Sequence, residues 1–112
     1  HVKDVSRAIS YSLDNNLSGT FNLGYGNYTI KDIGLAIKKL VPSTNIDYVD
    51  IQFEDKRDYK AGFTKMDNTG FKTKHSLEEG IMEIYSLFKE GRITDVCNPI
   101  YSNEAYLQGK LS

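Results

Sequence analysis

The chain has 112 residues, enough for one small domain. Its 14 basic and 15 acidic residues leave a net charge of -1, which argues against nucleic acid as a main partner because that contact depends on neutralising phosphates. No apolar run approaches the length of a membrane span, so we expect no membrane contact.

The N-terminal segment predicts an amphipathic helix over about residues 3–15. Its apolar residues recur at helical spacing: Val2, Val5, Ala8, Ile9 and Leu13. Asp4 lies in the first turn, where a carboxylate complements the helix dipole. The chain starts at His1 without a methionine and enters this pattern at once. We therefore expect the start to be a fragment boundary.

A short strand is predicted next, over residues 20–24, where glycines bound a stretch with weak alternation of polar and apolar residues. The turn Gly24-Tyr25-Gly26 that follows resembles the start of a dinucleotide-binding loop. The third glycine of that motif would fall at Thr29 and is absent, so a glycine-rich turn is the favoured interpretation.

Thr29 opens a second predicted helix, and Asp32 three positions later completes a capping box. Pro42 ends this helix, since proline disfavours a helical residue before it. Alternating residues then predict a strand over residues 46–53. Beyond a charged loop, we expect an extended piece over residues 59–64 and a single helical turn after it.

The third predicted helix has the clearest signals. Ser76 and Glu79 form a capping box at its start, and Gly91 is placed as its C-terminal cap. The elements together predict a small α/β domain of the α+β kind, with about three helices and a few short strands. We expect a substrate-binding domain over residues 1–93 and a loosely packed tail over residues 94–112.

Residues that could carry catalysis or bind a metal are few. His1, His75 and Cys97 are the only soft metal ligands, and no two of them stand at ligand spacing. We therefore predict no metal site and no catalytic residue in this chain. A single cysteine cannot form an internal disulfide, which fits a reducing compartment and predicts a cytoplasmic protein.

Arg57 is the strongest candidate for ligand binding. Its guanidinium can hold a phosphate or diphosphate with two parallel hydrogen bonds, and it follows a predicted strand end, where ligand-facing loops emerge. Tyr59 is two positions on, so its ring can point to the same side. The structural alternatives are a solvated arginine in a charged loop and a core tyrosine.

Taken together, these residues resemble the C-terminal, substrate-binding portion of the extended short-chain dehydrogenase/reductase family, which contains the NAD-dependent nucleotide-sugar epimerases and dehydratases. Four segments carry the resemblance, in the family's order and spacing: His1-Val2-Lys3-Asp4-Val5, Gly19-Thr20-Phe21-Asn22-Leu23-Gly24-Tyr25-Gly26, Asp55-Lys56-Arg57-Asp58-Tyr59 with Phe63-Thr64-Lys65, and Thr69-Gly70-Phe71-Lys72 with Ser76-Leu77-Glu78-Glu79-Gly80-Ile81. It covers roughly residues 1–93 and implies the C-terminal lobe of a Rossmann-type enzyme.

The resemblance also implies roles for particular residues. Arg57 would contact the diphosphate or nearby ribose of a nucleotide-sugar, while Asn22 and Tyr59 would lie near the nucleotide or support that arginine. Asp4 and Lys65 would be structural positions. An N-terminal domain, absent here, would carry NAD and a tyrosine–lysine catalytic pair.

The departures from the family pattern limit what the chain can do. Its own sequence has neither the cofactor glycine loop nor the Y-x-x-x-K pair, so we predict that it binds no NAD and is inactive alone. Thr69 replaces an apolar residue and Thr73 stands where proline is frequent. The alternative is a free-standing, non-catalytic binding or interaction module of the same ancestry. A lobe cut from its partner exposes apolar surface, so we expect self-association or marginal stability.

Overall fold

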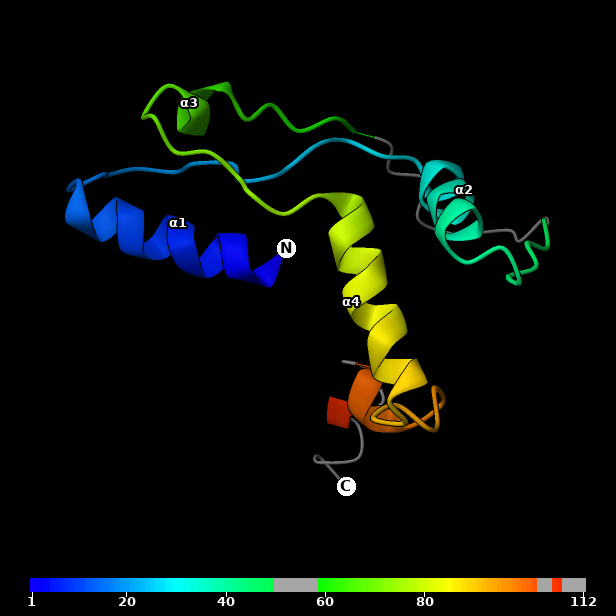
Figure 1. The fold of residues 1–112 in the computed structure, drawn as a ribbon. Coiled ribbons are helices and arrows are strands. Elements are labelled where there is room, and N and C mark those ends of the chain that lie inside the picture. Colours follow the sequence, from blue (N-terminus) through cyan, green and yellow to red (C-terminus); the bar gives the residue numbers. More distant parts are fainter. Residues whose placement is uncertain (50–58, 103–105, 108–112) are drawn as a thin grey trace. The chain divides into compact units, whose positions relative to one another are not determined.

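The computed structural model describes residues 1–49, 59–102 and 106–107. Helices are the regular elements in these ranges (Figure 1), and they are α1 (Val2–Asp14), α2 (Ile30–Leu40), α3 (Thr64–Asp67), α4 (Leu77–Lys89) and the 3-10 helix η1 (Pro99–Tyr101). The chain divides into two compact units, His1–Met82 and Glu83–Ser112.

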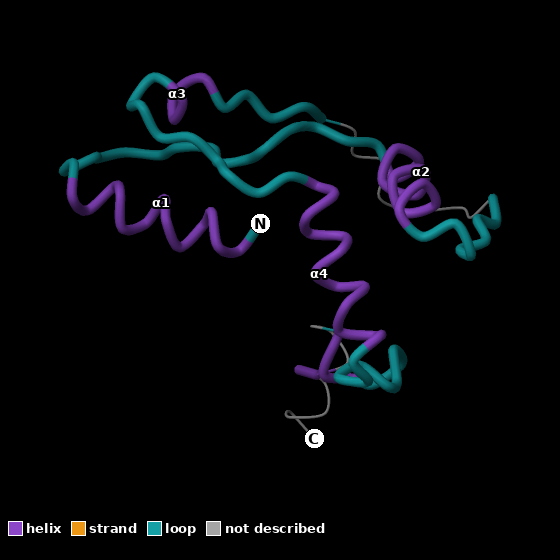
Figure 2. Tube along the Cα trace, in the orientation of Figure 1, coloured by secondary structure: helices purple, strands orange, loops and turns teal. Residues whose placement is uncertain are grey.

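The α/β prediction is wrong, because the described residues contain helices and loops but no strand. The segments over residues 20–24 and 59–63 are loops, and so is the described part of the third predicted strand, residues 46–49 (Figure 2). Residues 50–53 of that strand lie outside the described ranges. The physical reason is that no ladder of backbone hydrogen bonds forms between residues 20–24 and residues 59–63. Side chains join them instead.

The predicted helices are present, and local signals set their ends. At the start of α2, the Thr29 hydroxyl accepts from the backbone N–H of Asp32 (3.1 Å) and the Asp32 carboxylate accepts from that of Thr29 (2.9 Å). This confirms the capping box. The helix ends at Leu40, before Pro42, and Lys38 donates to the Pro42 carbonyl (2.8 Å).

Helix α4 has a second confirmed capping box. The Ser76 hydroxyl accepts from the Glu79 backbone N–H (3.1 Å), and the Glu79 carboxylate accepts from the Ser76 backbone N–H (2.6 Å). These two bonds satisfy donors that the first helical turn leaves without partners. Gly91 lies just beyond the helix with a φ of 68°, the left-handed conformation expected of a C-terminal glycine cap.

The core of the first unit is small. Its buried apolar residues are Ala8 of α1, Met66 of α3 and Phe71, and the half-buried residues packed against them are Tyr11, Phe21 and Leu23. The single turn of α3 therefore has a packing role, because it carries Met66 into this core. Asp4 is also buried, which is unusual for a carboxylate and needs a compensating set of partners.

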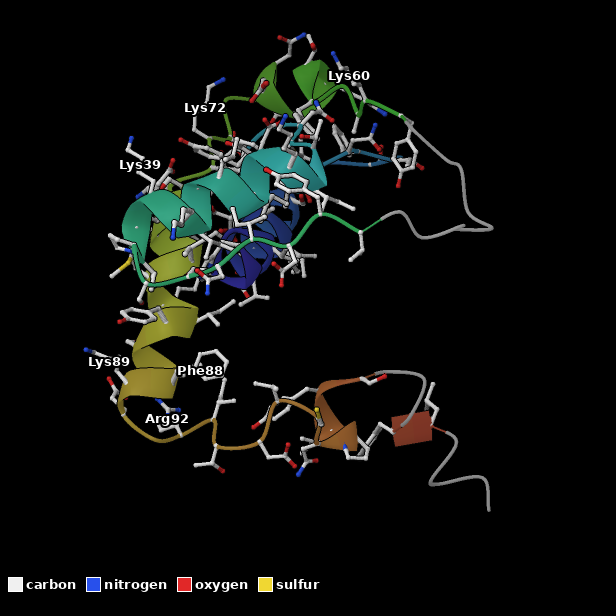
Figure 3. All side chains as sticks on the ribbon, turned by 90° about the vertical axis from the view of Figure 1, so that its right-hand side faces the viewer. Lys39, Lys60, Lys72, Phe88, Lys89 and Arg92 are labelled. Atoms are coloured by element: carbon white, nitrogen blue, oxygen red, sulfur yellow. The ribbon has the colours of Figure 1, made fainter. Side chains whose placement is uncertain are left out.

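The second unit holds the last turns of α4 and the tail. Phe88 is 43% exposed near the end of α4, where Lys89 and Arg92 also extend from the ribbon (Figure 3). Asn98 caps η1 by accepting from the backbone N–H of Ile100 (3.0 Å). Cys97 is exposed in the turn before it.

Candidate functional site

Two loop segments that are distant in the sequence lie side by side in the first unit, residues 20–28 and 59–65. The pairs that join them are Lys65 with Thr20, Asn22 with Gly62, and Asn27 with Ala61. Residue numbers rise along one segment as they fall along the other, so the segments run antiparallel. We call this pair of segments the bridged pair.

Side chains make all of these connections. Lys65 Nζ donates to the Thr20 carbonyl (2.7 Å), and Asn22 Nδ2 donates to the Gly62 carbonyl (3.2 Å). Asn27 Nδ2 donates to the Ala61 carbonyl (3.0 Å), while its Oδ1 accepts from the Ala61 backbone N–H (2.9 Å). An asparagine side chain thus takes the place of a neighbouring strand at Ala61.

The glycine-rich turn has a packing role in the bridged pair. A Cβ at Gly24 would lie 2.4 Å from the Phe63 ring, and one at Gly26 would lie 3.2 Å from the Tyr28 ring. Glycine is needed at position 24 because the aromatic ring rests directly on the backbone. An aromatic ring thus faces each glycine of the turn, as a packed glycine-rich turn would show.

The structure places two of the three predicted site residues on the bridged pair. Asn22 is exposed and bonded to Gly62, and Tyr59 is 79% exposed at the start of the second segment. No hydrogen bond joins these two side chains within the described ranges. Arg57 lies outside the described residues.

A second cluster centres on the buried carboxylate of Asp4. Its two oxygens accept from the backbone N–H groups of Lys74 (3.0 and 3.2 Å) and His75 (2.9 Å). The Arg7 guanidinium, one turn along α1, pairs with the same carboxylate and also donates to the Lys72 carbonyl (3.2 Å). Asp4 thereby joins the start of α1 to the segment that leads into α4.

Hydrogen bonding decides the ionisation of Asp4. Burial by itself would raise the pKa of this carboxyl, but the backbone N–H groups of His75 and Lys74, helped by the side chains of His75 and Arg7, outweigh that effect and hold its pKa well below the ordinary value. Asp4 is therefore an ionised structural residue, and its low pKa gives no sign of acid–base catalysis.

The two histidines lie together in the first unit. The His1 and His75 rings stack with their centroids 4.6 Å apart. His75 Nδ1 lies 3.2 Å from an Asp4 oxygen, within ion-pair distance. Cys97 belongs to the other unit. Among the residues described, no cluster of three His, Cys, Asp or Glu side chains is arranged to hold a metal ion.

Two surface hollows of the first unit lie along α1. One, of about 460 Å³, is lined by α1 and residues 70–72, and the other, of about 300 Å³, is apolar and lies between α1 and Phe21, Leu23 and Met66. Neither includes Asn22 or Tyr59. Asn22 and Tyr59 are both exposed on the bridged pair.

Comparison with known proteins does not assign the chain to a family. No protein-family model matches it, and no solved structure matches it. Within the described ranges, none of the helices combines the length and apolar character that crossing a bilayer requires. The functional assignment therefore depends on the residues themselves.

Sequence reasoning missed one residue of the bridged pair. Asn27 makes two of its hydrogen bonds, although the sequence pattern assigns it no role. The available signal is its place next to Gly26, since asparagine in a glycine-rich turn can bond a backbone through its side chain. Its partner, Ala61, is 34 residues away and has no polar side chain to suggest the pairing.

Proposed function

We propose that this chain is the C-terminal, substrate-binding part of an NAD-dependent nucleotide-sugar epimerase or dehydratase. In this role it holds the diphosphate of the nucleotide-sugar, while a separate N-terminal domain carries NAD and the catalytic residues. Firm retention of the diphosphate matters for such an enzyme, because binding energy from a non-reacting part of the substrate positions the reacting sugar.

One observation supports the proposal most directly: segments of the resemblance, or residues beside them, are hydrogen-bonded in two pairs. Asp4 of the first segment accepts from the backbone at residues 74 and 75, beside the fourth. Thr20 and Asn22 of the second segment bond with residues 62–65, the end of the third. Thr20 and Lys65, which belong to separate segments of the resemblance, therefore meet in space.

The proposed ligand contacts are Arg57, Asn22 and Tyr59. Arg57 supplies the charge, since charge-assisted, bidentate bonds from a guanidinium are the strongest available to a diphosphate. Asn22 retains a second amide hydrogen, and the exposed Tyr59 has a phenol hydroxyl. Both groups can donate hydrogen bonds to ribose or phosphate oxygens. Tyr59 also offers a ring face to a nucleobase.

The surface of α1 supports the proposed partner domain. Val2 is 75% exposed, Ile9 59% and Leu13 73%, and all three lie on one face of the helix. Together with Val5 (48%) they form an apolar stripe of the kind that another protein surface covers. We propose that the NAD-binding domain covers it in the whole enzyme and that the chain alone self-associates through it. The proposed compartment is the cytoplasm, as the single cysteine suggests.

Titration with nucleoside diphosphates tests the proposal. The chain is titrated with UDP, dTDP, GDP and CDP in turn, by NMR, beside its Arg57→Ala variant and an Arg92→Ala control. Arg92 is a matched control because its side chain is 69% exposed and belongs to the other unit. We expect weak binding of at least one probe, lowered about tenfold in Arg57→Ala and unchanged in Arg92→Ala.

Each other outcome has a defined meaning. If none of the probes binds, the proposed function is wrong. If one binds equally to both variants, Arg57 is not part of the site. Tight binding by the 112-residue chain would favour a free-standing module, because half of a two-domain cleft should bind weakly.

A further inference from the structure

The bridged pair depends on few connections. A strand pair is fixed by a ladder of backbone hydrogen bonds, whereas here the register depends on the side chains of Lys65, Asn22 and Asn27. Each of these connections therefore determines where one stretch of the second segment lies.

Asn27 differs from the other two residues because it bonds both backbone groups of its partner. Its Oδ1 and Nδ2 meet the N–H and the C=O of Ala61 at 2.9 and 3.0 Å. This double contact fixes the position of the Ala61 backbone and its rotation about the chain axis. It also fixes the orientation of the Asn27 amide. If its oxygen and nitrogen were exchanged, the NH₂ group would face the Ala61 N–H, and two donors would meet.

Asn27 makes the last connection before the ligand-facing residue. From Phe63 toward the N-terminus, Gly62 is hydrogen-bonded to Asn22, and Ala61 is hydrogen-bonded to Asn27. Tyr59 and Lys60, the next two residues back, make no hydrogen bond to the rest of the described chain, and Lys60 extends away from the ribbon (Figure 3). The direction in which the chain leaves Ala61 therefore sets the place of Tyr59.

We infer that Asn27 is a positioning residue, which aligns Tyr59 with Asn22 on the ligand-binding face by holding the Ala61 backbone. The inference rests on the proposed function. It assigns Asn27 an indirect role, since its amide groups are engaged with Ala61. Loss of Asn27 should leave the core of Ala8, Met66 and Phe71 intact, because that core has no contact with this amide.

Three variants of the 112-residue chain test the inference by NMR. Asn27→Ala removes both bonds to Ala61, and Asn27→Gln keeps the same groups on a longer side chain. Asn68→Ala is the control, because Asn68 is exposed and its side chain makes no hydrogen bond within the described ranges. The readouts are hydrogen exchange at the Ala61 amide, the Tyr59 ring resonances, and affinity for UDP, dTDP, GDP and CDP.

We expect Asn27→Ala to speed exchange at Ala61, shift the Tyr59 ring resonances and weaken binding about tenfold, with folding unchanged by circular dichroism. Asn27→Gln should recover part of the affinity, and Asn68→Ala should match the unchanged chain. A merely structural asparagine would alter exchange at Ala61 without altering affinity.

The outcomes separate this inference from the proposed function. If the unchanged chain binds a probe and Asn27→Ala binds it equally, the inference is overturned and the proposed function stands. Slow exchange at Ala61 in Asn27→Ala would overturn the inference whatever the affinities are. If the unchanged chain binds no probe, the proposed function fails, and the ligand-directed part of the inference fails with it.

Discussion

Replacing Asp4 should be the most destabilising single change to a polar residue of α1. The side chain is only 2% exposed and is the acceptor for the backbone N–H groups of Lys74 and His75. An alanine at position 4 leaves these two donors without an acceptor, and each such loss is worth about 1–3 kcal/mol. We therefore expect Asp4→Ala to lower the free energy of unfolding by about 2–5 kcal/mol.

Asparagine at the same position gives a finer test. Asp4→Asn keeps one carbonyl oxygen as an acceptor but removes the charge and points an NH₂ group at backbone donors. We expect a loss of about 1–3 kcal/mol, measured by urea unfolding followed with far-ultraviolet circular dichroism. Asp14→Asn is the control, because Asp14 is an exposed carboxylate in the same helix.

The pH dependence follows from the lowered pKa of Asp4. A carboxyl whose pKa is lower in the folded than in the unfolded state adds stability above its unfolded pKa, roughly 3.9, and loses it as the pH falls toward the folded value. The stability gap between the unchanged chain and Asp4→Asn should be constant near neutral pH and shrink below about pH 4. Equal unfolding midpoints for Asp4→Asn and Asp14→Asn at neutral pH would refute this account of the cluster.

Three further substitutions probe other parts of the first unit. Gly24→Ala should lower the free energy of unfolding by about 1–3 kcal/mol, because the added Cβ would lie 2.4 Å from the Phe63 ring. Gly62→Ala is the control, because a Cβ there would have no atom within 4 Å, and it should leave the melting temperature unchanged in the same thermal melts. Ser76→Ala removes the cap of α4 and should cost about 1 kcal/mol; an unchanged melting temperature would contradict that role. Ile9→Ser should reduce self-association in sedimentation velocity, and an equal distribution of species would exclude the apolar stripe of α1 as the contact.

The helices could be predicted from the sequence because their signals are local. Thr29 and Asp32 are three residues apart, as are Ser76 and Glu79, and each pair forms the two bonds that the pattern predicts. Capping depends on the first turn alone, so no knowledge of the rest of the fold is needed. Helix starts at positions 30 and 77 follow from those pairs.

The strands could not be predicted in the same way. A strand needs a partner with which it exchanges backbone hydrogen bonds, and alternation in one segment does not identify that partner. The segments over residues 20–28 and 59–65 do lie side by side, as two strands would. Their contacts come from Asn22, Asn27 and Lys65, so the pairing exists without the regular ladder that the prediction required.

The same limit applies to the buried carboxylate. Its position in the first turn of α1 predicts a favourable interaction with the helix dipole and nothing more. In the structure, the Asp4 carboxylate accepts from the backbone N–H groups of Lys74 and His75, which lie 70 and 71 positions further along the chain. Only the resemblance pointed to a structural role, because no local pattern predicts which backbone groups a buried carboxylate will meet.

A pairing made by side chains has a consequence for the proposed binding surface. In a backbone ladder every residue contributes, so one substitution rarely changes the register. In the bridged pair a single amide determines the place of Ala61 and therefore of Tyr59. Ligand affinity should then respond to Asn27 and Asn22 more strongly than overall stability does, because both side chains are exposed and neither belongs to the apolar core.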